Sequence, residues 1–175
     1  MTDTVPPIPA WLAHLPTTGG LVVPWVTPRT QDGRYLLGAV RGDRIARALR
    51  ERLCGVCGRP LEDRMVLLMR LSDLPRQATV EPALHPQCAA YTTAACPMVA
   101  GRVSHHRTTP MRLDATMAAS ADASARAGAP AEPWFAVWLS TYRLTVVHGE
   151  LAASYAEIRP LRIRPITWQL PDIFS

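Results

Sequence analysis

The sequence contains no lysine, so all 19 of its basic residues are arginine. Phenylalanine is also scarce, with two copies in 175 residues, and alanine supplies much of the 48% apolar fraction. No run approaches the roughly 18 consecutive apolar residues that a membrane-spanning helix needs, so a spanning protein is not expected. The first residues lack the basic and apolar regions of a secretory signal, and we therefore expect a cytoplasmic protein.

The absence of lysine has two explanations, and composition alone does not decide between them. A GC-rich genome replaces lysine codons with arginine codons. The alternative is functional, because the planar guanidinium group recognises phosphate and carboxylate groups. Against 14 acidic residues, the arginines give a formal net charge of +5 and an isoelectric point of about 9.5. A chain of this length can bury a core without disulfides.

Composition divides the chain into four segments. Residues 1–34 are rich in proline, and we expect an irregular arm that is anchored to the domain by Trp11 and Trp25. The other segments are a helix plus zinc-knuckle module at 35–112, an alanine-rich linker or weak helix at 113–133, and a β segment packing on the same domain at 134–175. We therefore predict a single α+β domain with short β-hairpins and two or three helices.

Several helices and strands have clear signals. Ile45, Leu49 and Leu53 recur at helical spacing after Asp43, a candidate N-cap, and predict a helix over 44–53. Proline fits the first turn of a helix and stops a helix at its end, so Pro86 and Pro97 predict a helix over 86–96. We expect a hairpin between strands at 65–71 and 77–81, and an edge strand at 161–166. Further strands are expected at 21–26, 34–40, 134–142 and 143–147. The stretch 151–158 is ambiguous between helix and strand.

Four residues have the spacing of a zinc site. Cys54 and Cys57 form a Cys-x-x-Cys pair, and His85 and Cys88 form a His-x-x-Cys pair after 27 intervening residues. Zinc takes four tetrahedral nitrogen and sulfur ligands, and two-residue spacers let each pair bind one ion from a tight turn or a helix start. Glycines at positions 55 and 58 permit the bend. We predict that these four residues bind Zn²⁺ in a closed, structural site.

Two other roles for these thiols stay open, as buried small hydrophobic residues or as redox cysteines. A thioredoxin-like site places its Cys-x-x-Cys pair at a helix start, whereas here the pair follows a helix. Cys96 lies eight residues beyond Cys88, roughly 12 Å along the same helix. We therefore expect Cys96 in the core, although it could replace His85 as a ligand if the helix breaks early.

The order of knuckle, hairpin and helix-start ligands over residues 53–97 resembles the treble-clef zinc finger. The zinc motifs of deaminases and metallopeptidases are absent. HNH nucleases use a similar frame, and His105 and His106 are the residues to test for that activity. Both follow the helix instead of lying on the hairpin, so we predict no catalytic residue and expect the pair in a polar turn or on a binding surface.

Arginines are concentrated beside the zinc motif. Six arginines and two acids lie between residues 41 and 59, which gives a local net charge of +4. Such a stripe suits phosphate contacts, or it is an ordinary solvated helix face. Arg159, Arg162 and Arg164 form a second basic set. The candidate nucleic-acid-binding residues are Arg41, Arg44, Arg47, Arg50 and Arg59.

Three motifs, at Pro24–Thr27, Cys54–Leu61 and His85–Pro97, resemble a group of uncharacterised actinobacterial and actinophage proteins. The resemblance implies a zinc site and a GC-rich bacterial or phage source, and it implies no reaction. We predict a non-enzymatic zinc-binding module that binds nucleic acid or acts as an adaptor. The alternatives are a protein–protein interaction subunit of a larger assembly and an HNH-like zinc-finger nuclease, and the oligomeric state stays open.

Overall fold

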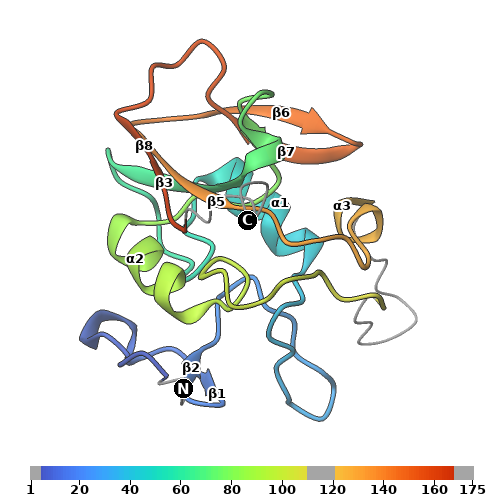
Figure 1. The fold of residues 1–175 in the computed structure, drawn as a ribbon. Helices are drawn as coiled ribbons and strands as arrows, with labels where there is room; N and C mark the ends of the chain where they lie inside the picture. Colours follow the sequence, from blue (N-terminus) through green and yellow to red (C-terminus); the bar gives the residue numbers. More distant parts are fainter. Residues whose placement is uncertain (1–4, 110–120, 168–175) are drawn as a thin grey trace.

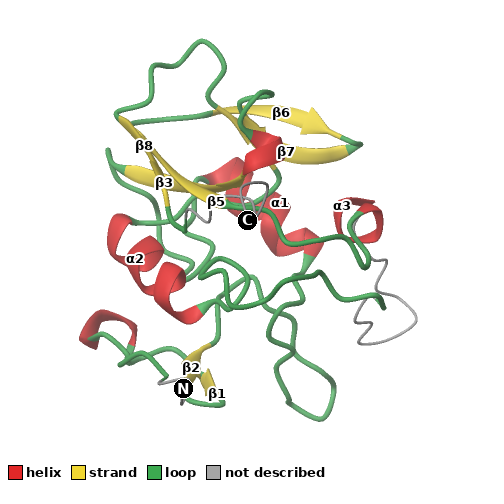
Figure 2. Ribbon diagram, viewed as in Figure 1, coloured by secondary structure: helices red, strands yellow, loops and turns green. Residues whose placement is uncertain are grey.

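The computed structural model describes residues 5–109 and 121–167 and shows a mixture of helix and sheet (Figure 1). These residues form three helices, α1 (Gly42–Glu51), α2 (Pro86–Ala95) and α3 (Ala121–Ala125), and three small antiparallel sheets (Figure 2). The predicted mixture of α and β structure is thus confirmed. No helix in this part of the chain has the length and apolar character needed to cross a bilayer.

The central sheet has the strand order β3 (Met65–Arg70), β5 (Trp134–Leu139) and β8 (Arg162–Pro165). Side chains alternate between the two faces of a strand. Val66 and Leu68 therefore join a core cluster with α2, whereas Leu67 and Met69 join a second cluster with Leu49 of α1. Both faces of β3 are buried, which explains its nearly continuous apolar sequence.

A second sheet packs on the α1 side of the central sheet, and a third lies in the N-terminal arm. The second sheet has the order β4 (Ala78–Thr79), β7 (Glu150–Ser154) and β6 (Arg143–Val147). Leu151 and Ala153 of β7 belong to the same core cluster as Leu49. The third sheet pairs β1 (Thr17–Thr18) with β2 (Leu21–Val22), and Figure 1 shows it in blue, apart from the other two sheets.

Both predicted long helices form, with one error in the capping. The helix predicted at 86–96 is α2, which ends at Cys96 as its C-cap. The helix predicted at 44–53 is α1, but its N-cap is Arg41, so the predicted cap at Asp43 is wrong. Asp43 lies in the first turn, where its carboxylate accepts hydrogen bonds of 2.9 and 2.6 Å from the Arg41 guanidinium. This bidentate pair occupies the oxygens that capping would have used.

The predicted hairpin between 65–71 and 77–81 is also wrong. Strand β4 pairs with β7, and β3 pairs instead with β5 along all six of its residues. The chain leaves β3 through a short 3₁₀ turn at Leu71–Asp73, where the Asp73 carboxylate accepts hydrogen bonds from the Arg70 backbone and guanidinium. After this turn the chain does not return alongside β3, and β5 pairs with β3 instead.

The later strands largely follow the prediction. Strands β5, β6 and β8 lie within the ranges expected for them, and β8 is an edge strand. The ambiguous stretch at 151–158 begins with strand β7 and continues without a helix. Part of the predicted linker at 113–133 lies outside the described residues, and its described part contains the short helix α3.

The two tryptophans of the N-terminal arm differ, because Trp25 packs against the domain at Gly58 whereas Trp11 does not become buried. Trp11 is 49% exposed, so its predicted anchoring role is wrong, whereas the neighbouring Leu12 is fully buried. The backbone N–H of Val22 donates to the Tyr91 hydroxyl of α2 at 3.0 Å. The expected strand at 21–26 is reduced to β2, and 34–40 contributes a single bridge between Tyr35 and Arg29.

A buried cluster of charges closes the end of the central sheet. The Arg70 side chain is 3% exposed and contacts Asp73 at 3.1 Å and Asp122 of α3 at 2.9 Å. Its guanidinium also lies 5.4 Å from the centroid of the Trp134 ring. Burial lowers the pKa of Arg70, but the nearby Glu81, Asp73 and Asp122 carboxylates together raise that pKa above its ordinary value. Arg70 therefore stays charged and joins α3 to the sheet.

We expect Arg70→Ala to lower the free energy of unfolding by about 3–5 kcal/mol, because it removes the nearest partner of the buried Asp73 carboxylate and leaves only Arg126, at 3.9 Å. Arg143→Ala is the matched control. Arg143 pairs with Glu157 at 2.6 Å, but its side chain is 67% exposed, so its loss should cost less than about 1 kcal/mol. Urea unfolding measures both values, and equal losses would contradict the assignment of Arg70 to the core.

Candidate metal centre

The structure brings Cys54, Cys57, His85 and Cys88 to one point. One ligand atom from each of these residues lies within 4.8 Å of all the others. The Cys57 Sγ and His85 Nδ1 atoms are 3.4 Å apart. A zinc tetrahedron with ligands about 2.0–2.3 Å from the ion has edges of about 3.5 Å. The cluster is therefore compatible with a metal ion, and among the described residues it is the one group of this kind.

Backbone hydrogen bonds shape the turn that carries the first two thiols. Helix α1 ends at Glu51, and its C-cap, Arg52, adopts a left-handed conformation with φ 54°. The Cys54 N–H then donates to the Arg59 carbonyl at 2.8 Å, and the Gly58 N–H donates to the Cys54 carbonyl at 2.8 Å. This tight turn, which we call the knuckle (residues 53–60), places Cys54 and Cys57 beside the same point.

The two glycines of the knuckle are needed for different reasons. Gly58 has φ +70°, and a Cβ atom there would lie 2.7 Å from the Trp25 ring. At Gly55, a Cβ atom would lie 2.6 Å from the Pro82 ring. Gly58 therefore permits the bend, as predicted, because its φ is positive. Gly55 is required for a different reason, the close approach of Pro82.

The N-terminal arm pairs with the knuckle. The backbone N–H of Trp25 donates to the Val56 carbonyl at 2.8 Å, and that of Val26 donates to the Gly55 carbonyl at 3.3 Å. On the other side, the Gly55 N–H donates to the Ala83 carbonyl at 3.1 Å. Segments distant in the sequence therefore hold the knuckle from two sides.

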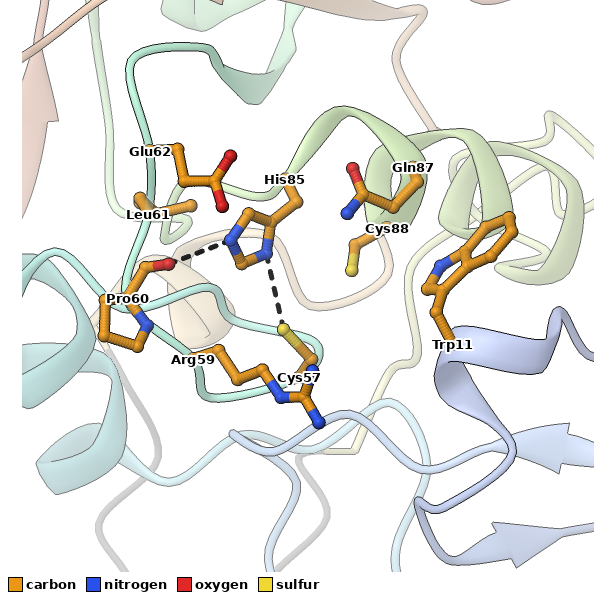
Figure 3. Close-up of a pocket in the computed structure, with 9 residues that line it drawn as sticks. All are labelled: Trp11, Cys57, Arg59, Pro60, Leu61, Glu62, His85, Gln87 and Cys88. Carbon is orange, nitrogen blue, oxygen red and sulfur yellow. Dashed lines mark hydrogen bonds between the residues drawn. The ribbon is translucent and has the colours of Figure 1, made fainter.

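The second ligand pair lies at the start of α2. His85 is the N-cap of the helix, and Pro86 and Cys88 are the first and third residues of its first turn. The His85 Nε2 atom lies 2.9 Å from the Pro60 carbonyl (Figure 3). Because a carbonyl can only accept, Nε2 carries the proton, and in neutral histidine Nδ1 then presents a lone pair to the cluster.

Burial and mutual hydrogen bonding control the charge of the thiols. Cys54 and Cys88 are 0% and 1% exposed, and Cys57 is half-buried. Hydrogen bonds to Cys54 and Cys88 hold the pKa of Cys57 well below its usual range. The same kind of contact, to Cys54 and Cys57, raises the pKa of Cys88. Cys57 therefore ionises first, and a cation is needed before all three thiols can be thiolates together.

The candidate centre borders a surface pocket of about 400 Å³. Cys57, His85 and Cys88 line it on one side, and the exposed Trp11 ring stands at another (Figure 3). The buried Cys54 is not among the lining residues. An ion could reach the cluster from solvent without unfolding of the core.

The other sequence candidates lie outside this cluster. Cys96 is partly buried and packs against the α2 core cluster, as predicted. His105 bridges to Pro130, and the His106 N–H donates to the Ala129 carbonyl at 2.8 Å. Burial, with a contribution from Arg126, lowers the pKa of His106. Neither histidine joins a metal-binding group within the described residues.

Two of the five candidate nucleic-acid-binding arginines are neutralised within the chain. Arg41 pairs with Asp43 at 2.6 Å, and Arg47 pairs with Glu51 at 3.0 Å. Arg47 also lies 6.0 Å from the centroid of the Trp25 ring. These contacts reduce the positive charge that α1 offers to a polyanion.

The remaining three candidates differ from one another. Arg44 donates to the Trp25 carbonyl and stacks over the Trp25 ring at 5.4 Å, so it helps to hold the arm. Arg50 and Arg59 have no ion-pair partner among the described residues. The structure does not gather the five arginines around one pocket, and Arg59 alone lines the pocket beside the candidate centre.

Sequence reasoning missed the groups that support the cluster. The Pro60 carbonyl orients His85, and Trp25 packs on Gly58. A backbone acceptor has no side-chain signature, so no sequence signal could have found Pro60. The Pro-Trp-Val-Thr motif at Pro24–Thr27 was a signal for Trp25, but its contact with the knuckle depends on the fold.

Comparison of the chain with family models, curated proteins and solved structures finds no match. The resemblance to actinobacterial and actinophage proteins therefore stays an expectation drawn from the three motifs.

Gly58→Ala tests the contact between the arm and the knuckle, with Gly149→Ala as its control. Both glycines have positive φ, +70° and +81°, but a Cβ atom at Gly149 meets nothing within 4 Å. The left-handed conformation alone should cost Gly149→Ala about 1–2 kcal/mol. Overpacking against Trp25 should cost Gly58→Ala about 1–3 kcal/mol more. Equal losses in urea unfolding would show that the Trp25 contact is unimportant.

Proposed function

We propose that Cys54, Cys57, His85 and Cys88 bind one structural Zn²⁺ ion in a non-enzymatic binding module. The observation that carries this proposal is the convergence of three sulfur atoms and one oriented imidazole nitrogen on a single point. Thiolate and imidazole are the ligands that zinc prefers in structural sites. The carbonyl of Pro60 supplies the outer hydrogen bond that metal-bound histidines usually make.

The number of ligands favours a structural over a catalytic ion. A catalytic zinc keeps one position open for water or substrate, with a general base beside it. Here the protein offers four ligands, which fill a tetrahedron. The proposed ion would join the knuckle to α2 and, through the knuckle, to the N-terminal arm.

The order of ligands supports a treble-clef-like description of residues 53–97. One pair comes from a knuckle and the other from a helix start, as that fold requires. The intervening segment departs from it, because β3 pairs with β5 and meets the returning chain only at a bridge between Val66 and Leu84. We therefore propose a related arrangement in which a distant strand completes the sheet.

Nucleic acid is the partner class that we propose for the module, on the basis of its net charge of +5. Helix α1 is a weaker candidate surface than its sequence suggested, since Arg41 and Arg47 are paired with acids. An adaptor role in a larger protein assembly is the alternative. An HNH-like nuclease is less favoured, because His105 and His106 lie outside the metal-compatible cluster.

Metal analysis of the purified chain tests the proposed zinc site. We expect about one zinc per chain, and chelation should unfold the protein or sharply lower its melting temperature. Cys57→Ser should reduce zinc to below about 0.3 per chain, because it removes one of four ligands. Cys96→Ser makes the same chemical change outside the cluster and should retain the metal. A wild-type chain that folds normally with little zinc would refute the proposal.

A further inference from the structure

A tryptophan lies among arginines on one face of the central sheet. Trp138 of β5 is paired with Arg162 of β8 on one side and with Val66 of β3 on the other. Directly opposite residues of antiparallel strands project from the same face. Arg164, two residues along β8, therefore also lies on the face that carries Trp138.

The same region holds a pocket with only cationic and apolar side chains. Arg64, Trp138, Leu161 and Arg162 line a pocket of about 320 Å³. Arg64 immediately precedes β3 and Arg162 lies in β8, so the two arginines reach the pocket from different segments of the chain. Glu62 and Asp63 precede Arg64 in the sequence, but neither of them lines this pocket.

The arginines of this surface are available for a ligand. Arg64, Arg162 and Arg164 are exposed, and none of them forms an ion pair with another described residue. Trp138 is partly exposed, so one part of its ring packs on the core while the remainder borders the pocket. In this respect the surface differs from α1, where Arg41 and Arg47 are already paired.

The chemistry of this surface matches a chain of phosphates that carries planar rings. Guanidinium groups bind phosphate, and an indole face stacks on a nucleobase whatever its identity. Bases in a duplex are already stacked on one another, so a partly exposed indole favours an unpaired strand. A free nucleotide also offers a phosphate and a base, but its phosphate would contact one arginine, whereas a strand could contact several.

We propose that Arg64, Trp138, Arg162 and Arg164 form a binding surface for single-stranded nucleic acid. This proposal rests on the nucleic-acid partner class proposed above and assigns that partner to the sheet instead of α1. A base stacks on Trp138, while the arginines on either side contact the flanking phosphates. Binding is sequence-tolerant, because neither stacking nor phosphate contact reads base edges.

Fluorescence anisotropy with a labelled oligothymidine of about 12 nucleotides tests the surface. Arg162→Gln/Arg164→Gln should weaken binding about 10-fold or more at low salt. It should also reduce the slope of log affinity against log salt by about 1.4, or about 0.7 for each lost phosphate contact. Arg50→Gln/Arg59→Gln removes the same charge elsewhere and should change affinity less than about 3-fold. Equal effects of the two double variants would overturn the proposal.

A second comparison separates stacking from charge. An abasic strand of the same length should bind the wild-type protein about 10-fold more weakly, and Trp138→Leu should abolish this preference for bases. Equal wild-type affinities for the abasic strand and the normal strand would overturn the stacking role of Trp138. So would tighter binding to a duplex, or binding only to a mononucleotide or to a phosphopeptide probe.

Zinc content, measured on the same samples, distinguishes the two proposals. Loss of strand binding with about one zinc per chain retained assigns the effect to this surface alone. A wild-type protein with full zinc and no strand binding refutes the surface and leaves the structural zinc site standing. A wild-type protein that binds the strand without zinc refutes the zinc site and supports the surface.

Discussion

Three thiols that share one small volume impose the main constraint on this structure. Cys54 and Cys88 are almost inaccessible to solvent, and Cys57 is held in a state that favours ionisation. If all three were thiolates, their charges would repel one another and would need a cation to balance them. The geometry of the knuckle, the orientation of His85 and the path of the arm are all consistent with that need.

The arm and the cluster support each other through the backbone. Trp25 and Val26 donate to the carbonyl groups of the knuckle, and the Trp25 ring covers Gly58. Arg44 of α1 in turn covers that ring and bonds to the carbonyl of Trp25. A segment that is too proline-rich to form long strands therefore gains order from the folded part of the chain.

Arginine has several separate tasks in this lysine-free chain. Arg70 is buried in a network of carboxylates, where a guanidinium can satisfy several acceptors at once. Arg52 bonds to Thr141 and to the Tyr142 carbonyl, so it joins the end of α1 to the loop after β5. These positions are explained by the contacts that the guanidinium groups make. Arg64, Arg162 and Arg164 of the sheet face form no ion pair with another described residue.

The sequence by itself determined the two long helices, most of the strands and the four residues that converge, because each depends on local spacing or on a short motif. Cys54 and Cys57 need only a tight turn to meet, and Pro86 marks the helix that carries Cys88. Tertiary structure alone decided that β3 pairs with β5, that the Pro60 carbonyl orients His85, and that Trp138 lies beside Arg162. These contacts join residues far apart in the chain, and their energy comes from packing that no local pattern records.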